Sequence, residues 1–135
     1  MAPDADYVLI IAGHNDAYKV KDNADSLQMF ADSLEVMLTG IEQHCPNARI
    51  GFVTPWYLDK PGFTDVVRVI QQACKRHKIP LLNNYNADCV IDVRSEAFRA
   101  KYFQHSTDTA HLNADGHDLF LPIAMQWFTS EVAHP

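Results

Sequence analysis

The stretch Tyr7-Val8-Leu9-Ile10-Ile11-Ala12 is a continuous apolar run, rich in β-branched residues and closed by Gly13. Such runs are typical of strands buried on both faces, as in a parallel sheet with helices above and below it. A glycine at the end of the strand permits a sharp turn. The stretch therefore predicts a buried strand over residues 7–12 and directs attention to the turn after it.

The sequence after this strand alternates between helical and strand patterns. Apolar residues at helical spacing predict a helix that Asn23 or Asp25 caps and that ends before Pro46. Its inner face comprises Leu27, Phe30, Leu34, Met37 and Ile41. Residues 50–54 predict a second buried strand, and Thr64 is expected to cap the next helix. The inner face of that helix comprises Val66, Val67, Ile70, Ala73 and Cys74.

The C-terminal half continues the alternation. Residues 79–82 predict a third strand, while the assignment of residues 89–93 stays open. Ser95 is expected to cap a short helix and Asn113 to cap the last one, which Pro122 should kink. The buried side of the last helix comprises Leu119, Phe120, Ile123, Ala124, Trp127 and Phe128.

Strands that alternate with helices predict an α/β fold, a three-layer α/β/α sandwich around a parallel sheet. The length of 135 residues fits one domain, residues 1–135. Ligands of such folds bind beyond the carboxyl ends of the strands. Candidate functional residues are therefore expected in the segments 13–16, 54–57 and 104–112.

Composition narrows the classes of partner. A net charge of −6 argues against a nucleic-acid surface, because phosphates require a positive field. The apolar run at residues 7–12 is too short to span a membrane, and no signal-peptide pattern is visible. Cys45, Cys74 and Cys89 lack a C-x-x-C pair and are expected to be reduced thiols, as in cytosolic proteins. The localisation itself stays open.

Two short segments can carry chemistry. Gly13-His14-Asn15-Asp16 follows the first strand, and an asparagine amide there can donate a hydrogen bond to an oxyanion while Asp16 supports the loop. A simple Asx turn explains the same residues. In the second segment, Asp108 precedes His111 by three residues and can hold its imidazole, leaving the other ring nitrogen free as a general base.

Together, Gly-x-Asn-Asp after a strand and Asp-x-x-His before the last helix resemble the motifs of the SGNH (GDSL-type) hydrolase superfamily. The resemblance implies a flavodoxin-like sandwich and a serine esterase that acts on small acyl esters or O-acetylated carbohydrate without a cofactor. It implies that Asn15 belongs to the oxyanion hole beside the motif glycine Gly13. It also implies that His111 is the general base and that Asp108 orients it.

The sequence departs from the family at the nucleophile. The Gly-Asp-Ser block and the second, glycine-bearing block are missing, so the first two strands of the family's sheet are absent from these residues. The five serines, none of them in a Gly-Asp-Ser context, are Ser26, Ser33, Ser95, Ser106 and Ser130. We therefore expect the isolated chain to be nearly inactive. The alternative is a non-catalytic SGNH-like module within a larger assembly.

Three further expectations concern the surroundings of the site. The aromatic residues Tyr18, Trp56 and Tyr57 can line a substrate cleft or simply cover the edge of the core. A metal site is the weaker reading of the residues His105, Asp108, His111, Asp115 and His117, because their spacing fits no specific zinc signature. In the family's strand order, residues 7–12 form an open sheet edge. A second copy or a complementary polypeptide is expected to cover that edge.

Overall fold

The computed structural model describes residues 2–21 and 23–134. At its centre is a parallel sheet with the strand order β1-β2-β3, made of β1 (Tyr7–Ile11), β2 (Arg49–Val53) and β3 (Leu81–Leu82). Val8 pairs with Ile50 across the first two strands, and Phe52 pairs with Leu81 across the next two. The parallel sheet predicted from the alternating pattern is confirmed, with β1 at an edge.

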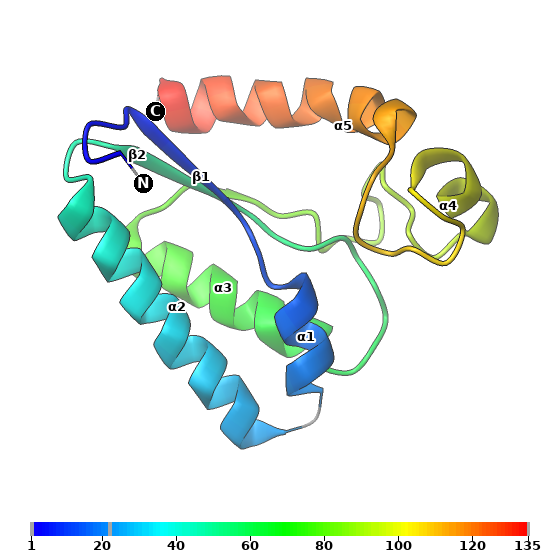
Figure 1. Ribbon diagram of the computed structural model, residues 1–135, viewed down its shortest axis with the longest axis horizontal. Helices are drawn as coiled ribbons and strands as arrows, with labels where there is room; N and C mark the ends of the chain where they lie inside the picture. Colours follow the sequence, from blue (N-terminus) through cyan, green and yellow to red (C-terminus); the bar gives the residue numbers. More distant parts are fainter. Residues whose placement is uncertain (1, 22, 135) are drawn as a thin grey trace.

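Helices lie on both faces of the sheet (Figure 1). One face carries α1 (His14–Val20), α2 (Ala24–His44) and α3 (Phe63–His77). The other face carries α5 (Ala114–Trp127), which continues into a π-helical turn, η1 (Phe128–Ala133), while α4 (Glu96–Tyr102) lies at one end. The predicted α/β/α sandwich is therefore confirmed. Short helix α1 was not predicted.

The main core lies between the sheet and the first helical layer. Phe52 on β2 is fully buried against the inner face of α3, which includes Phe63, Val66 and Ile70. On the opposite face, a Cβ atom on Gly51 would lie 2.7 Å from the ring of Trp127. The absence of a side chain at Gly51 thus permits α5 to lie close to β2.

Three of the predicted helix caps are confirmed. The side chain of Asn23 accepts a hydrogen bond from the Ser26 N–H, and those of Ser95 and Asn113 accept corresponding bonds at α4 and α5. The predicted cap at Thr64 is wrong, because α3 already begins at Phe63 after Gly62, which has a left-handed φ of 89°. The Thr64 hydroxyl instead lies 3.0 Å from the hydroxyl of Tyr85.

The prediction that residues 7–12 are buried on both faces is wrong. Tyr7, Leu9 and Ile11 are 44%, 51% and 76% exposed, because no strand lies beyond β1 among the described residues. The side chains of Val8 and Ile10, on the other face, are partly buried beneath the helices. The apolar run thus predicted the strand correctly, and the open sheet edge that the family's strand order implies for residues 7–12 is confirmed.

The structure also differs from the predicted elements in smaller respects. In α2 the buried side chains are Leu34, Leu38 and Ile41. Leu38 thus takes the inward place that was predicted for Met37, which is 38% exposed. The third strand is shorter than the predicted residues 79–82. Residues 89–93 form turns, not a strand.

The last helix is less buried than predicted. Gly116 is its one fully buried residue, whereas the predicted inner side is only partly buried and Ile123 is 38% exposed. Pro122 lies within α5 on an exposed position, and the helix continues beyond it to Trp127. None of the helices in the described part of the chain is long and apolar enough to cross a membrane.

An ionic cluster joins α2 to α3. Nδ1 of His77 lies 2.9 Å from Glu42, and its Nε2 lies 2.9 Å from Glu35, which also bonds to Arg76. Hydrogen bonds to Glu35 and Glu42 raise the pKa of His77 above its ordinary value of 6.5. Hydrogen bonds from Arg76 and His77 lower the pKa of Glu35 below 4.5.

This cluster predicts a pH dependence of stability. The contribution of His77 is complete below pH 6.5 and is lost as the pH rises through its raised folded pKa. The contribution of Glu35 is present above pH 4.5 and is lost as the pH falls through its lowered pKa. We expect the urea unfolding free energy to fall as the pH rises above 6.5 through the raised pKa of His77, and His77→Gln to remove most of that fall. An equal effect of His105→Gln, at an exposed loop position, would contradict this assignment.

Candidate active site

The Asp108–His111 pair lies in the loop between α4 and α5. Oδ2 of Asp108 is 3.0 Å from Nδ1 of His111, and Oδ1 accepts hydrogen bonds from the backbone N–H groups of Ala110 (2.8 Å) and His111 (3.0 Å). The carboxylate therefore holds both the imidazole and the turn that carries it. With Nδ1 engaged in this way, Nε2 of His111 is available for proton transfer.

The two partners differ in their exposure to solvent. The side chain of Asp108 is 15% exposed and that of His111 is 76% exposed. Burial pushes the pKa of Asp108 upward, but hydrogen bonds from the Ala110 and His111 backbone and from the His111 ring outweigh it. The pKa of Asp108 consequently lies below its ordinary value, so the carboxylate is ionised at neutral pH and can stabilise an imidazolium beside it.

His111 borders an apolar cavity of about 460 Å³ at the carboxyl ends of β1 and β2. Its wall comprises Ile11, Ala12, His14, Val53, Thr54, Pro55, Trp56, Ala110, His111, Leu112, His117 and Phe120. The cavity has the size and lining of a small-molecule site, with a few polar groups on apolar walls. It lies at the place that the parallel-sheet rule predicts.

Gly13 makes the turn from β1 into this site. Its φ is 106°, and a Cβ atom there would lie 2.8 Å from Cδ1 of Ile70. Both facts exclude an ordinary side chain, so the predicted sharp glycine turn is confirmed. The turn leads directly into α1, which places His14 in the cavity wall and Asn15 on an exposed position of the first helical turn.

The structure thus separates the residues of the first motif. Asn15 is adjacent to a wall residue but is not itself part of the wall, and its oxyanion role stays a prediction. Asp16 borders a shallow hollow between α1 and α2 instead of the cavity. The two motifs do meet, because Nε2 of His14 lies 3.4 Å from the hydroxyl oxygen of Thr109.

The three aromatic candidates occupy different positions. Trp56 lines the cavity, donates from Nε1 to the carbonyl of Ala110 at 3.2 Å and packs edge-on against Phe120. Tyr18 lies behind the cavity wall against His14. Tyr57 packs against Tyr85 and is not among the residues that line the cavity, so its part in a substrate cleft stays a prediction.

None of the five serines lines the cavity. Ser95 caps α4, and Ser106 contributes its carbonyl to Arg99. The cavity hydroxyl of Thr54 is buried and accepts hydrogen bonds from the backbone N–H groups of Asn84 and Tyr85. Within residues 2–21 and 23–134, no three His, Cys, Asp or Glu side chains are arranged to hold a metal ion.

Two wall residues, His14 and His117, were given no part in the esterase site predicted from the sequence, and His117 was considered only as a metal ligand. His14 is the variable second residue of Gly-x-Asn-Asp, and His117 lies six residues after His111. The place of His14 in the sequence could have indicated its role. It directly follows the glycine that ends the first strand, and ligands of such folds bind at the carboxyl ends of the strands. His117 faces the cavity because it lies in the first turn of α5, on the side of Leu112.

No protein-family model and no curated protein matches this sequence. Three crystal structures share the fold. One, of an unspecified protein, has a TM-score of 0.78 at 20% identity and aligns with 98% of this chain over 68% of its own. A structural-genomics protein from Lactobacillus plantarum has a TM-score of 0.75 at 20% identity, with 96% and 69% covered. An acetyl xylan esterase has a TM-score of 0.65 at 12% identity, with 93% and 67% covered.

Proposed function

We propose that this chain supplies the acid–base pair and an oxyanion donor to an ester hydrolase of the SGNH type. The observation that carries the proposal is the 3.0 Å contact between Asp108 and His111 at the rim of an apolar cavity. Support also comes from the Gly-x-Asn-Asp turn beside it and from the fold shared with an acetyl xylan esterase. The proposed substrates are small acyl esters, O-acetylated carbohydrate among them.

The proposed reaction is acyl transfer through a serine hydroxyl. Nε2 of His111 accepts the serine proton as the oxygen attacks the ester carbonyl, while Asp108 stabilises the resulting imidazolium. The side-chain amide of Asn15 donates to the oxyanion of the tetrahedral intermediate. His111 then returns the proton to the departing alcohol. In the second half, water attacks the acyl-serine with His111 again as base, which releases the acid and restores the serine.

The serine of this scheme has to come from outside the 135 residues, because no serine of the chain lines the cavity. We expect the isolated chain to hydrolyse p-nitrophenyl acetate barely above background, since acyl transfer by this route requires a covalent nucleophile. The protein recovered from its source with its bound polypeptides should react with a fluorophosphonate probe. Mass spectrometry should place the label on a serine other than the five in this chain.

Two results would contradict this assignment. One is hydrolysis by the isolated chain that His111→Ala abolishes but that survives replacement of all five serines. The other is a fully assembled protein that takes no fluorophosphonate label. The second result favours the alternative function, a non-catalytic SGNH-like module, which the lack of a serine at the cavity also supports.

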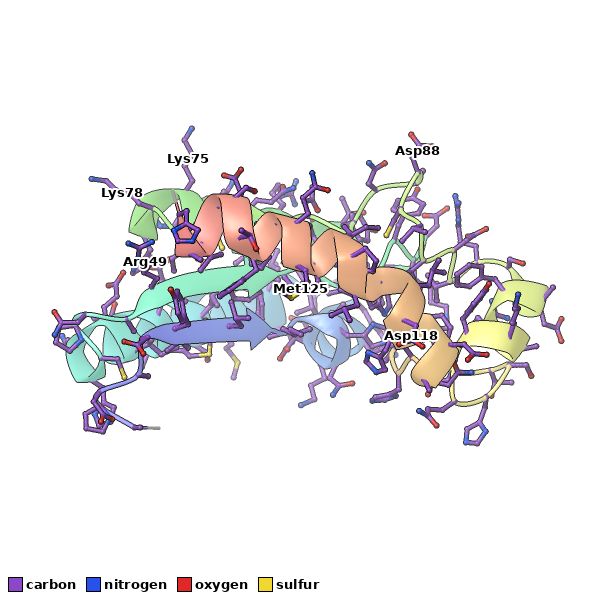
Figure 2. All side chains as sticks on the ribbon, turned by 90° about the horizontal axis from the view of Figure 1, so that it is seen from above. Arg49, Lys75, Lys78, Asp88, Asp118 and Met125 are labelled. Carbon is purple, nitrogen blue, oxygen red and sulfur yellow. The ribbon has the colours of Figure 1, made fainter. Side chains whose placement is uncertain are left out.

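We also propose that another strand pairs with the free edge of β1. Leu9 and Ile11 are exposed on this edge, and Leu121 and Met125 of α5 are 55% and 51% exposed. Met125 lies on the flank of α5 that borders β1 (Figure 2). Together these residues form an apolar strip along an unpaired edge, which soluble proteins rarely leave uncovered. A strand paired along the whole of β1 would reach Ile11, which lines the cavity.

A further inference from the structure

His14 is the polar side chain that reaches the cavity from the end of β1. It follows Gly13 directly, and its ring is held edge-on by Tyr18 (centroids 5.4 Å apart) and Phe63 (5.2 Å apart). Tyr18 and Phe63 also pack against each other at 5.2 Å. The imidazole plane is thus fixed by two aromatic neighbours from α1 and α3, a rigidity that a merely solvated histidine lacks.

The ring reaches the loop of the Asp108–His111 pair through Thr109. Nε2 of His14 lies 3.4 Å from the Thr109 hydroxyl oxygen, which is in turn 3.2 Å from the hydroxyl of Tyr18. Lys60 approaches the same Tyr18 hydroxyl at 3.4 Å. His14 and Tyr18, both on α1, therefore contact Thr109. Thr109 directly follows Asp108 and directly precedes the backbone N–H groups that the Asp108 carboxylate binds.

The surroundings of the other ring nitrogen, Nδ1, determine the protonation state of His14. Nδ1 is buried and has no hydrogen-bond partner among the described residues. A proton on Nδ1 would bury an unpaired N–H group, and a protonated ring would bury an unpaired charged one. The least costly state is a neutral imidazole with its proton on Nε2. In that state Nε2 donates to Thr109, whose own hydroxyl is free to donate to Tyr18.

We propose that His14 is a positioning residue for His111: as a neutral imidazole protonated on Nε2, it holds Thr109 and thereby keeps the Asp108–His111 loop against α1. The catalytic consequence rests on the proposed esterase function, but the structural role does not. His14 and His111 are then expected in opposite tautomers, because Asp108 holds the proton of His111 on Nδ1.

The electrostatic surroundings support a neutral His14. Burial lowers the pKa of His14, His111 and Lys60 lower it further, and Asp108 opposes them. The groups that face the ring come from each packed element: Tyr18 from α1, Lys60 from the loop before α3, and Asp108 and His111 from the catalytic loop. Burial is the largest of these effects, and together they hold the pKa of His14 below 6.5, so the ring is uncharged at neutral pH.

The first test is ¹⁵N NMR of the whole chain labelled at histidine, since long-range nitrogen–proton couplings identify the tautomer of each imidazole. The expected result is Nε2–H for His14 and Nδ1–H for His111 at neutral pH. A protonated His14, or a His14 with its proton on Nδ1, would overturn the proposal.

The second test uses His14→Phe, which keeps an aromatic ring between Tyr18 and Phe63, and Thr109→Val, which removes the hydroxyl without touching the α1 core. Both are expected to raise amide hydrogen exchange at Ala110 and His111 by at least about tenfold and to mix the tautomers of His111. His105→Phe, in the same loop region, should change neither signal. Unchanged exchange and an unchanged His111 tautomer in Thr109→Val would refute the proposal even if His14→Phe fails to fold. These measurements do not depend on enzymatic activity. If the variants lose loop order but the protein proves to be no esterase, the proposed function is refuted and the structural role of His14 stands.

Discussion

Replacing His111 with alanine is expected to lower kcat of the assembled enzyme on p-nitrophenyl acetate by about 10⁴-fold or more. The variant lacks the imidazole that Asp108 orients to accept the serine proton. Asp108→Asn should cost about 10³- to 10⁴-fold, because the amide cannot hold the Nδ1–H tautomer of His111 that the 3.0 Å contact selects. KM should change much less than kcat in both variants, since neither side chain contributes much apolar contact to the substrate.

The matched control for this prediction is His105→Ala, six residues before His111 and exposed. It should retain kcat within about twofold. Equal losses in His105→Ala and His111→Ala, or full activity in Asp108→Asn, would contradict the proposed acid–base pair.

The second large effect is expected at the edge of the sheet. Leu9→Lys places a charge on the face of β1 where the side chain is 51% exposed in the described chain. The chain by itself should tolerate the lysine, because the ammonium group stays in water. The complex with the pairing strand should not, because an unpaired charge buried in an apolar interface costs about 3 kcal/mol, or about 100-fold in Kd.

Sedimentation velocity measures this effect, with Val36→Lys as the control. Val36 is also an exposed apolar residue, at 74%, but it lies on α2 far from the edge. The wild-type protein and Val36→Lys should sediment as the assembled species, and Leu9→Lys as the 15.3 kDa chain. A wild-type protein that sediments at 15.3 kDa in the presence of its source extract would refute a covered edge.

The candidate site was predictable in part because its chemistry is local. Asp108 and His111 are three residues apart, so their contact depends on one turn whose backbone N–H groups the same carboxylate binds. The turn at Gly13 was predictable for the same reason. His14 was not, because its importance arises from Phe63 and Thr109, which are 49 and 95 residues away in the chain. No local sequence pattern indicates contacts between residues so far apart in the chain.

The sequence by itself determined the order of strands and helices, three helix caps and the two motif segments. Hydrophobic periodicity and helix capping depend on residues that are close in the chain, so they can be recognised in the sequence without knowledge of the fold. Only the tertiary structure decided how far each side chain of β1 is exposed, that Asn15 lies outside the cavity wall and that Tyr57 packs against Tyr85 instead of lining the cavity. Burial and side-chain direction depend on which distant segment packs against each face, and the same apolar run suits a central strand and an open edge equally well.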